Sequence, residues 1–245
     1  MKICRHIFML ANVSDVMKIS IIGGAGRVGT AIAFSILHSA KPSELVLVDI
    51  MKDAVKGEAL DLGHATVTLS PGTKVTGTDD YGAIKGSDVI IFAAGRARKP
   101  DETRDQLLEF NSNIARTAAE KISEFAPTAK ILVVTNPSMQ LGVVMREATG
   151  FPASQIIVMD NQLDTARLKY YVAQETGQSV SGLKSYVKGE HGESMEFEML
   201  DKIGAKQAER AKSLTKEAGI TIIRLKGHTC WGIASQVAEE VKKLK

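Results

Sequence analysis

The chain has 245 residues, which is enough for one large domain or two modest ones, each with its own apolar core. Its 31 lysines and arginines stand against 28 aspartates and glutamates, so the formal charge of +3 gives no general reason to expect nucleic acid as a partner. No apolar run reaches the length of a transmembrane helix, and we expect no membrane partner. Cys4 and Cys230 lie far apart and lack metal-ligand spacing, which favours a reducing compartment and predicts a cytoplasmic protein.

Residues 1–16 have only a superficial likeness to a signal peptide. Lys2 and Arg5 precede a short apolar stretch, but no clean cleavage site with small residues follows before Asp15. Met17, which directly precedes the first predicted strand, is a more natural first residue for the protein. We therefore interpret residues 1–16 as a non-native or disordered extension.

A glycine-rich turn joins the first predicted strand, 18–22, to the first predicted helix. Its glycines have the G-x-G-x-x-G spacing, which lets a phosphate approach bare backbone at a helix N-terminus. Such a pattern is weak when it stands alone. The predicted cofactor-binding residues in this turn are Gly24, Gly26, Arg27, Val28 and Gly29.

Asp49 strengthens that prediction. It ends a second predicted strand, 44–48, about 20 residues after Gly29, where an acidic residue that accepts the ribose hydroxyls of a dinucleotide should fall. Its carboxylate would repel a 2′-phosphate, and no arginine follows in 50–52. The pattern favours NAD over NADP as the cofactor, with Lys52 leaving NADP open.

Strands and helices then alternate, which predicts an α/β fold with a doubly wound parallel sheet. The continuous apolar run 87–94 is typical of a strand buried on both faces. The other predicted elements are a helix at 52–63, a strand at 74–78, a helix at 105–125 and a strand at 129–135. The apolar residues that share one face of the helix at 105–125 are Leu107, Phe110, Ile114, Ala118, Ile122 and Phe125.

Two polar segments follow buried strands, and parallel sheets bind their ligands at that end of the strands. Residues 96–104 contain four basic side chains, so they form either a solvated basic loop or a lid that closes guanidinium groups over an anionic substrate. Asn136, before Pro137, marks either a simple turn or an amide placed over a nicotinamide and a substrate hydroxyl.

The residues best suited to acid–base chemistry lie further along. On a helix that begins near Asn161, Asp164 and Arg167 are three residues apart and share one face. His191 follows a predicted strand, 183–188, in a turn where a side chain can be presented. If His191 meets Asp164, the carboxylate fixes the imidazole tautomer and raises its pKa, as a general acid/base requires. The alternative is a solvated histidine and a surface ion pair.

The last third of the chain reads as a strand at 194–200 and two amphipathic helices, one spanning 208–222 and one starting near Trp231. We expect no metal site, because the remaining histidines have no partners at metal-ligand spacing and are interpreted as structural. These histidines are His6, His38, His64 and His228.

Taken together, these motifs resemble those of the malate and lactate dehydrogenase family, from Met17 to the end of the chain. The matching segments are residues 24–29, Asp49, residues 94–95 with Arg98 and Arg104, residues 135–137, residues 163–167 and residues 189–192. The resemblance implies a Rossmann NAD-binding domain at 17–145 and an α+β substrate domain at 146–245. It also implies that the substrate domain is C-terminally incomplete, because family members continue for several dozen residues.

The resemblance implies a role for each site residue. His191 would donate and accept the proton, Asp164 would orient it, and Arg167 would clamp the C1 carboxylate of the substrate. Asn136 would hydrogen-bond the substrate or the nicotinamide.

Two arginines would decide the substrate. Arg104 would polarise the reacting carbonyl, and Arg98 would bind a second carboxylate, where lactate dehydrogenases typically carry glutamine. Asp101 and Glu102 depart from the family pattern and put two carboxylates near the path of an anion.

The implied activity is the reversible oxidation of (S)-malate to oxaloacetate, as in the tricarboxylic acid cycle, by an oxidoreductase that is a homodimer or homotetramer. Two alternatives stay open. One is lactate or another 2-hydroxy acid as substrate, and the other is an inactive nucleotide-binding fragment.

Overall fold

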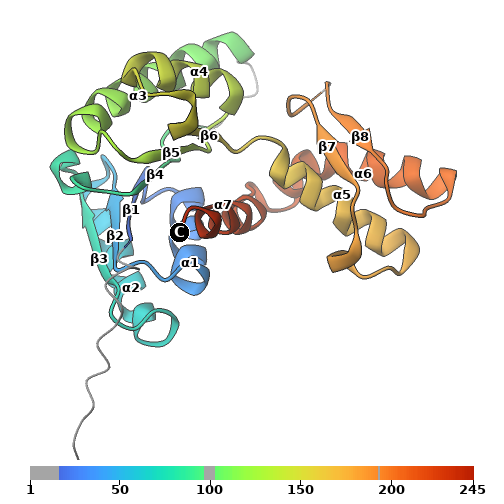
Figure 1. Cartoon of the computed structure of the whole chain (residues 1–245), viewed down its shortest axis with the longest axis horizontal. Coiled ribbons are helices and arrows are strands. Elements are labelled where there is room, and N and C mark those ends of the chain that lie inside the picture. The colour runs from blue at the N-terminus through green and yellow to red at the C-terminus, as the bar shows by residue number, and fades with distance from the viewer. Residues whose placement is uncertain (1–16, 97–102, 193) are drawn as a thin grey trace, which may run out of the picture.

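The computed structural model describes residues 17–96, 103–192 and 194–245, except for the side chain of Arg104. The predicted extension 1–16 and Arg98 lie outside the described residues. Two units can be distinguished, a large one built on a parallel sheet and a smaller one built on two helices and a hairpin (Figure 1). In the part of the chain that is described, no helix is both long and apolar enough to cross a membrane.

Within these residues, six parallel strands form the large sheet in the order β3-β2-β1-β4-β5-β6. This order reverses between β1 and β4, as in doubly wound folds, and it confirms the predicted fold class. The strands are β1 (Lys18–Ile22), β2 (Glu44–Val48), β3 (Lys74–Thr78), β4 (Val89–Phe92), β5 (Lys130–Val133) and β6 (Ile156–Val158).

The central strands are buried on both faces, which explains why their sequences lack polar alternation. In β4, Val89 and Ile91 belong to the core on one side of the sheet, whereas Ile90 and Phe92 belong to the core on the other side. All four side chains are at most 2% exposed. The sheet is therefore a layer between two apolar cores.

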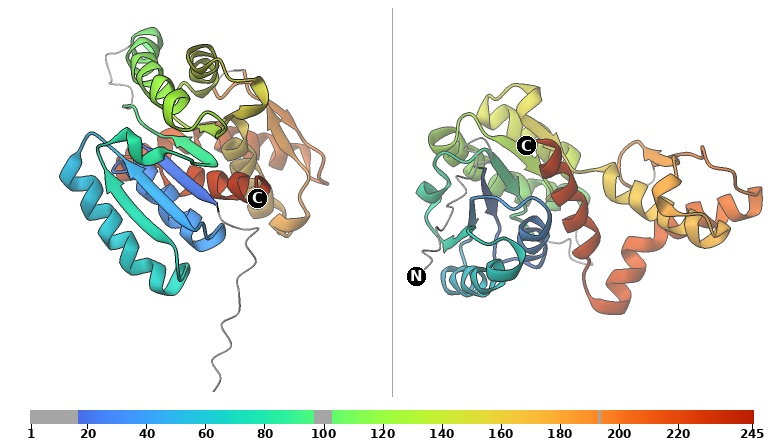
Figure 2. Two further views of the ribbon diagram at one scale, coloured as in Figure 1. Left: turned by 60° about the vertical axis from the view of Figure 1, so that its left-hand side comes forward. Right: turned by 60° about the horizontal axis from the view of Figure 1, so that its bottom comes forward.

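Helices cover both faces of the sheet (Figure 2). Residues of α1, α2 and α7 form one core with the sheet, and residues of α3 and α4 form the other. A short 3-10 helix, η2 (Tyr81–Ile84), also packs into the second core. The helices are α1 (Arg27–Ser39), α2 (Lys52–Leu69), α3 (Arg104–Phe125), α4 (Ser138–Thr149) and α7 (Trp231–Lys243).

The smaller unit has its own apolar core, centred on Leu168, Val172 and Val187. It consists of α5 (Asn161–Thr176), α6 (Ala205–Lys226) and an antiparallel pair of three-residue strands, β7 (Tyr186–Lys188) and β8 (Glu196–Glu198). Two 3-10 turns, η3 (Ala153–Gln155) and η4 (Val180–Gly182), complete the chain. The predicted boundary at 145/146 stays a prediction, and the structure places β6 and α7, both beyond it, on the large unit.

Several features differ from the sequence-based expectation. Helix α4 and strand β6 were not predicted, and both are short, since α4 has 12 residues and β6 has three. Helix α2 continues to Leu69, past the predicted end at residue 63, and an isolated glycine at 63 has open space around it. Phe110, assigned to the buried face of α3, is 45% exposed and lies under the Arg96 guanidinium instead, 4.3 Å from it.

Candidate active site

The glycine turn between β1 and α1 has no room for side chains at two of its three predicted glycines. A Cβ atom on Gly24 would lie 2.7 Å from Leu47 Cβ, and one on Gly29 would lie 2.2 Å from the Gly23 carbonyl oxygen. Gly26 is the N-cap of α1 and has no side chain to bond the first backbone N–H groups of the helix. The turn therefore packs tightly on the sheet while presenting bare N–H groups, as a diphosphate requires.

Asp49 lies beside this turn, at the carboxyl end of β2. Its Oδ2 atom accepts a hydrogen bond from the Ala25 N–H (3.0 Å), and its Oδ1 atom accepts one from the Met51 N–H (3.0 Å). The carboxylate thus connects the glycine turn to the start of α2. A diphosphate cradle with an adjacent carboxylate for ribose hydroxyls fits a nicotinamide dinucleotide.

Arg27, the first residue of α1, reaches the turn between α6 and α7. Its Nη1 atom lies 3.2 Å from His228 Nδ1, and His228 Nδ1 lies 3.2 Å from the Lys226 carbonyl oxygen. His228 was interpreted as structural, and it contacts a residue that is 201 positions away in the sequence. The contact places the start of α1 beside the turn that precedes α7.

The predicted acid–base residues come together in the smaller unit. Asp164, on the first turn of α5, is 1% exposed, and its Oδ2 atom lies 2.6 Å from His191 Nδ1. Its Oδ1 atom accepts a hydrogen bond from Arg167 Nη1 at 3.0 Å, and the Arg167 side chain is 12% exposed. One buried carboxylate therefore holds an imidazole on one oxygen and a guanidinium on the other.

This arrangement has an electrostatic consequence for His191. The hydrogen bond from the ring to Asp164 raises the pKa of His191 above its usual range, although burial opposes the effect. The bond also fixes the tautomer of the ring, because Nδ1 must carry a hydrogen in order to donate a hydrogen bond to the Asp164 carboxylate. Nε2 is then left to exchange a proton with a ligand.

Asn136 lies three residues after the end of β5, next to the segment that follows β4. Thr135 Oγ1 donates to the Ala94 carbonyl oxygen (2.9 Å), and Asn111 Nδ2 donates to the Asn136 carbonyl oxygen (2.8 Å). The Asn136 side chain is exposed, at the carboxyl end of the strands, where the glycine turn after β1 also lies. Asn111 was not predicted, since a polar residue among apolar helix positions was its only signal.

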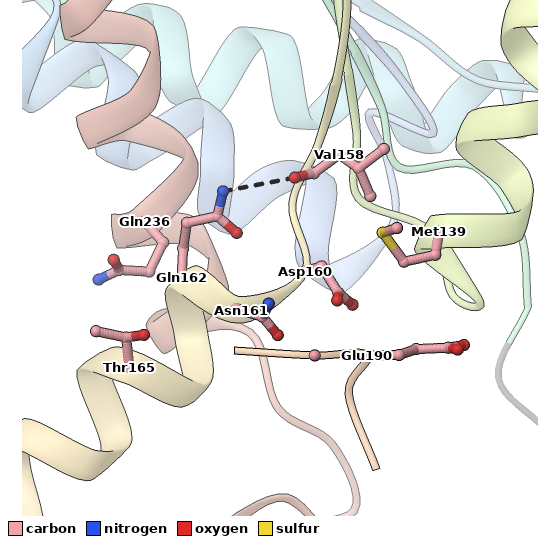
Figure 3. A pocket seen from close by; sticks show the side chains of 9 residues that line it. Met139, Val158, Asp160, Asn161, Gln162, Thr165, Glu190 and Gln236 are labelled. Atoms are coloured by element: carbon pink, nitrogen blue, oxygen red, sulfur yellow. Dashed lines mark hydrogen bonds between the residues drawn. The ribbon is translucent and has the colours of Figure 1, made fainter. Parts of the chain in front are cut away.

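A cavity of about 700 Å³ adjoins the His191 turn (Figure 3). Two carboxylates in its wall were not predicted: Asp160 accepts from Ser138 Oγ (3.3 Å), and Glu190 accepts from Gln140 Nε2 (2.7 Å). Burial raises the pKa of the Asp160 carboxyl, against the effect of the Ser138 bond. Negative charge in this wall disfavours an anionic ligand on that side. The lining residues are Met139, Val158, Asp160, Asn161, Gln162, Thr165, Gly189, Glu190 and Gln236.

The structure thus joins His191, Asp164 and Arg167 directly, and it places Asn136 and Asp49 on the end of the sheet where parallel strands terminate. It describes the backbone of Arg104 as the first residue of α3. Of the residues described, no three histidines, cysteines or acidic residues cluster in a way that would hold a metal ion.

Comparison with known proteins adds a family to this geometry. Residues 17–158 match the model for the NAD-binding domain of lactate/malate dehydrogenases. A malate dehydrogenase from Archaeoglobus fulgidus is 37% identical over 228 residues, which cover 92% of this chain and 76% of that protein. An L-lactate dehydrogenase from Clostridium acetobutylicum is 38% identical over 177 residues, covering 72% of this chain and 56% of the other.

The likeness extends to three dimensions. The solved structure of the Archaeoglobus fulgidus malate dehydrogenase in complex with NADH has a TM-score of 0.84 at 35% identity, over 92% of this chain and 76% of that one. The family match covers more than half of the chain, and it includes the glycine turn and Asp49. The chain therefore belongs to the lactate/malate dehydrogenase family.

Proposed function

We propose that the chain is an NAD-dependent malate dehydrogenase that interconverts (S)-malate and oxaloacetate. The observation that carries the proposal is the buried Asp164 carboxylate, which holds His191 and Arg167 on its two oxygens in a chain of this family. This set supplies a proton carrier and a carboxylate clamp. The relatives named malate dehydrogenase support the choice of substrate.

His191 is the general acid and base of the proposed reaction. For oxaloacetate reduction the protonated ring gives a proton from Nε2 to the carbonyl oxygen, and for malate oxidation the neutral ring removes it from the hydroxyl. Asp164 holds Nδ1–H at 2.6 Å and stabilises the imidazolium. NAD, when bound, supplies the acceptor or donor of the hydride at C2 of the substrate.

Three arginines neutralise the dicarboxylate. Arg167 clamps the C1 carboxylate, since its planar fork suits two parallel hydrogen bonds, and the Asp164 bond at 3.0 Å holds the guanidinium in place. Arg98 takes the second carboxylate and Arg104 polarises the carbonyl. Asn136, from the end of β5, hydrogen-bonds the substrate or the nicotinamide.

The cofactor residues act through backbone and charge. Gly24, Gly26 and Gly29 let the diphosphate approach the start of α1, with Arg27 and Val28 between them. Asp49 accepts the ribose hydroxyls and repels a 2′-phosphate, which favours NAD.

The test is NADH oxidation by the purified chain with oxaloacetate and, separately, with pyruvate. We expect turnover of oxaloacetate well above that of pyruvate. The Arg98→Gln variant should reverse or flatten that preference, because an unpaired guanidinium in a water-poor site selects against a methyl group. Preference of the unaltered chain for pyruvate would assign it to the lactate side of the family, and turnover of neither would make it a nucleotide-binding fragment.

We further propose that the chain forms a homodimer or homotetramer in the cytoplasm. Exposed apolar side chains on α1 and α2 support self-association: Phe34 is 47% exposed, Leu60 64% and Val67 77%. The measurement is the mass of the purified chain by light scattering, and a mass of 26.4 kDa at every concentration would contradict the proposal.

A further inference from the structure

Asn111 is a fully buried polar residue in the middle of α3. Its exposed fraction is 0%, and the apolar residues Ala115 and Ala118 follow it on the buried side of the helix. A carboxamide in such surroundings is costly unless its donors and acceptor are paired. Its position therefore requires partners, and none of them comes from its own helix.

The partners of Asn111 are backbone groups of two other segments. Its Oδ1 atom accepts from the Arg96 N–H (3.2 Å), and its Nδ2 atom donates to the Arg96 carbonyl oxygen (3.3 Å). The same Nδ2 atom donates to the Asn136 carbonyl oxygen (2.8 Å). Both amide hydrogens are thus used, one on each segment.

These segments follow the neighbouring strands β4 and β5, and they are packed closely together. Thr135 Oγ1 donates to the Ala94 carbonyl oxygen at 2.9 Å, which is a second bond between them. Gly95, at φ +151°, has no room for a side chain, since a Cβ atom would lie 2.5 Å from Thr135 Cγ2 and 3.0 Å from Asn111 Oδ1. Alanine at position 111 removes all three hydrogen bonds of the carboxamide.

We propose that Asn111 is a positioning residue of the active site, which fixes residues 94–96 and the Asn136 backbone at one spacing. It does not touch the substrate. It acts through Asn136, whose side chain serves the proposed reaction, and through the Arg96 backbone, which it holds beside the Asn136 backbone. The catalytic part of this inference rests on the proposed function, whereas the structural tie does not.

The kinetic test compares Asn111→Ala with two variants on the same helix. Ile122→Ala also removes a fully buried side chain of α3, but far from Arg96, so it controls for lost stability. Asn113→Ala removes an exposed asparagine. We expect Asn111→Ala to lower kcat/KM for oxaloacetate by about 10²-fold, because small misplacement of reacting groups is enough to do so. Both controls should keep kcat/KM when assayed well below their melting temperatures.

A second readout does not need turnover. Hydrogen exchange of the amides in 94–96 and 134–136 should quicken in Asn111→Ala and stay slow in Ile122→Ala. If the unaltered chain fails to reduce oxaloacetate, the proposed function falls, and hydrogen exchange still decides whether Asn111 ties the two segments. Equal exchange in the two variants, or equal kcat/KM in an active enzyme, would overturn the inference.

Discussion

The two halves of the proposed active site are built by different means. In the large unit, the cofactor turn depends on backbone clearance: Gly29 lies where any Cβ would meet the Gly23 carbonyl oxygen at 2.2 Å. In the smaller unit, the acid–base site depends on one buried charge, Asp164, which is 1% exposed. The first half excludes side chains, and the second is organised by them.

The two units also differ in the size of their apolar cores. The sheet unit has a core on each face of six strands, whereas the smaller unit has three-residue strands and one small core. The apolar layer positions the glycine turn together with its bonds to Val48 and Asp49 at the end of β2. The smaller unit holds its catalytic geometry through the ion pair and hydrogen bonds of Asp164. Substitutions in the two halves should therefore fail differently.

Asp164→Asn should have the largest effect. The variant keeps the shape of the side chain but removes the charge that orients His191 and balances Arg167, so we expect kcat for oxaloacetate reduction to fall by about 10²–10⁴-fold. Leaving Arg167 without its buried partner should also lower the free energy of unfolding by about 3–5 kcal/mol. Steady-state kinetics and urea unfolding measure the two losses.

The control for this charge is Glu124→Gln, which breaks a surface pair with Lys121 whose side chains are 54% and 43% exposed. It should cost less than about 1 kcal/mol and leave kcat unchanged. If both variants behaved alike, the smaller unit would not depend on its buried charge.

Gly29→Ala should have the next largest effect, and it should appear in cofactor binding. The added methyl group collides with the Gly23 carbonyl oxygen, so the turn must move, at a cost of about 1–3 kcal/mol in stability and a loss of NADH affinity. Gly57→Ala on α2 is the matched control. No heavy atom lies within 4 Å of its added Cβ, so this variant should gain about 0.5–1 kcal/mol. Fluorescence titration of NADH and thermal unfolding distinguish the two glycines, and equal NADH affinity would show that the turn is not the cofactor cradle.

The smallest effect concerns pH. Because the bond to Asp164 raises the pKa of His191, the ring stays protonated to higher pH than a free histidine. Oxaloacetate reduction should persist to higher pH than an ordinary histidine would allow and decline as pH rises through the raised pKa, while malate oxidation rises in the same interval. The stability that this pair contributes should be complete below the usual histidine pKa and be lost as pH rises through the raised one. A pH profile of kcat/KM that declines with the ordinary histidine pKa, or below it, would contradict the Asp164–His191 pairing in solution.

The sequence predicted most of the sheet and the meeting of His191 with Asp164, for physical reasons. Buried parallel strands show continuous apolar runs, such as the one that contains Ile90 and Phe92, and the glycine spacing gained weight from Asp49 at the expected distance. Strand β6 has only three residues and carries no periodicity, so it could not be recognised. The roles of Asn111 and Asp160 depend on contacts between segments distant in the sequence, and no local pattern encodes such contacts.

The measurement that tests the central claim most directly is turnover by His191→Gln beside the unaltered chain, with NADH binding followed in the same samples. Glutamine retains a polar side chain but cannot carry the proton. We predict that oxaloacetate reduction falls by about 10²–10⁴-fold while the dissociation constant of NADH stays within about twofold, because the cofactor turn lies in the other unit. Unchanged turnover in an active enzyme would contradict the assignment of His191 as the acid and base.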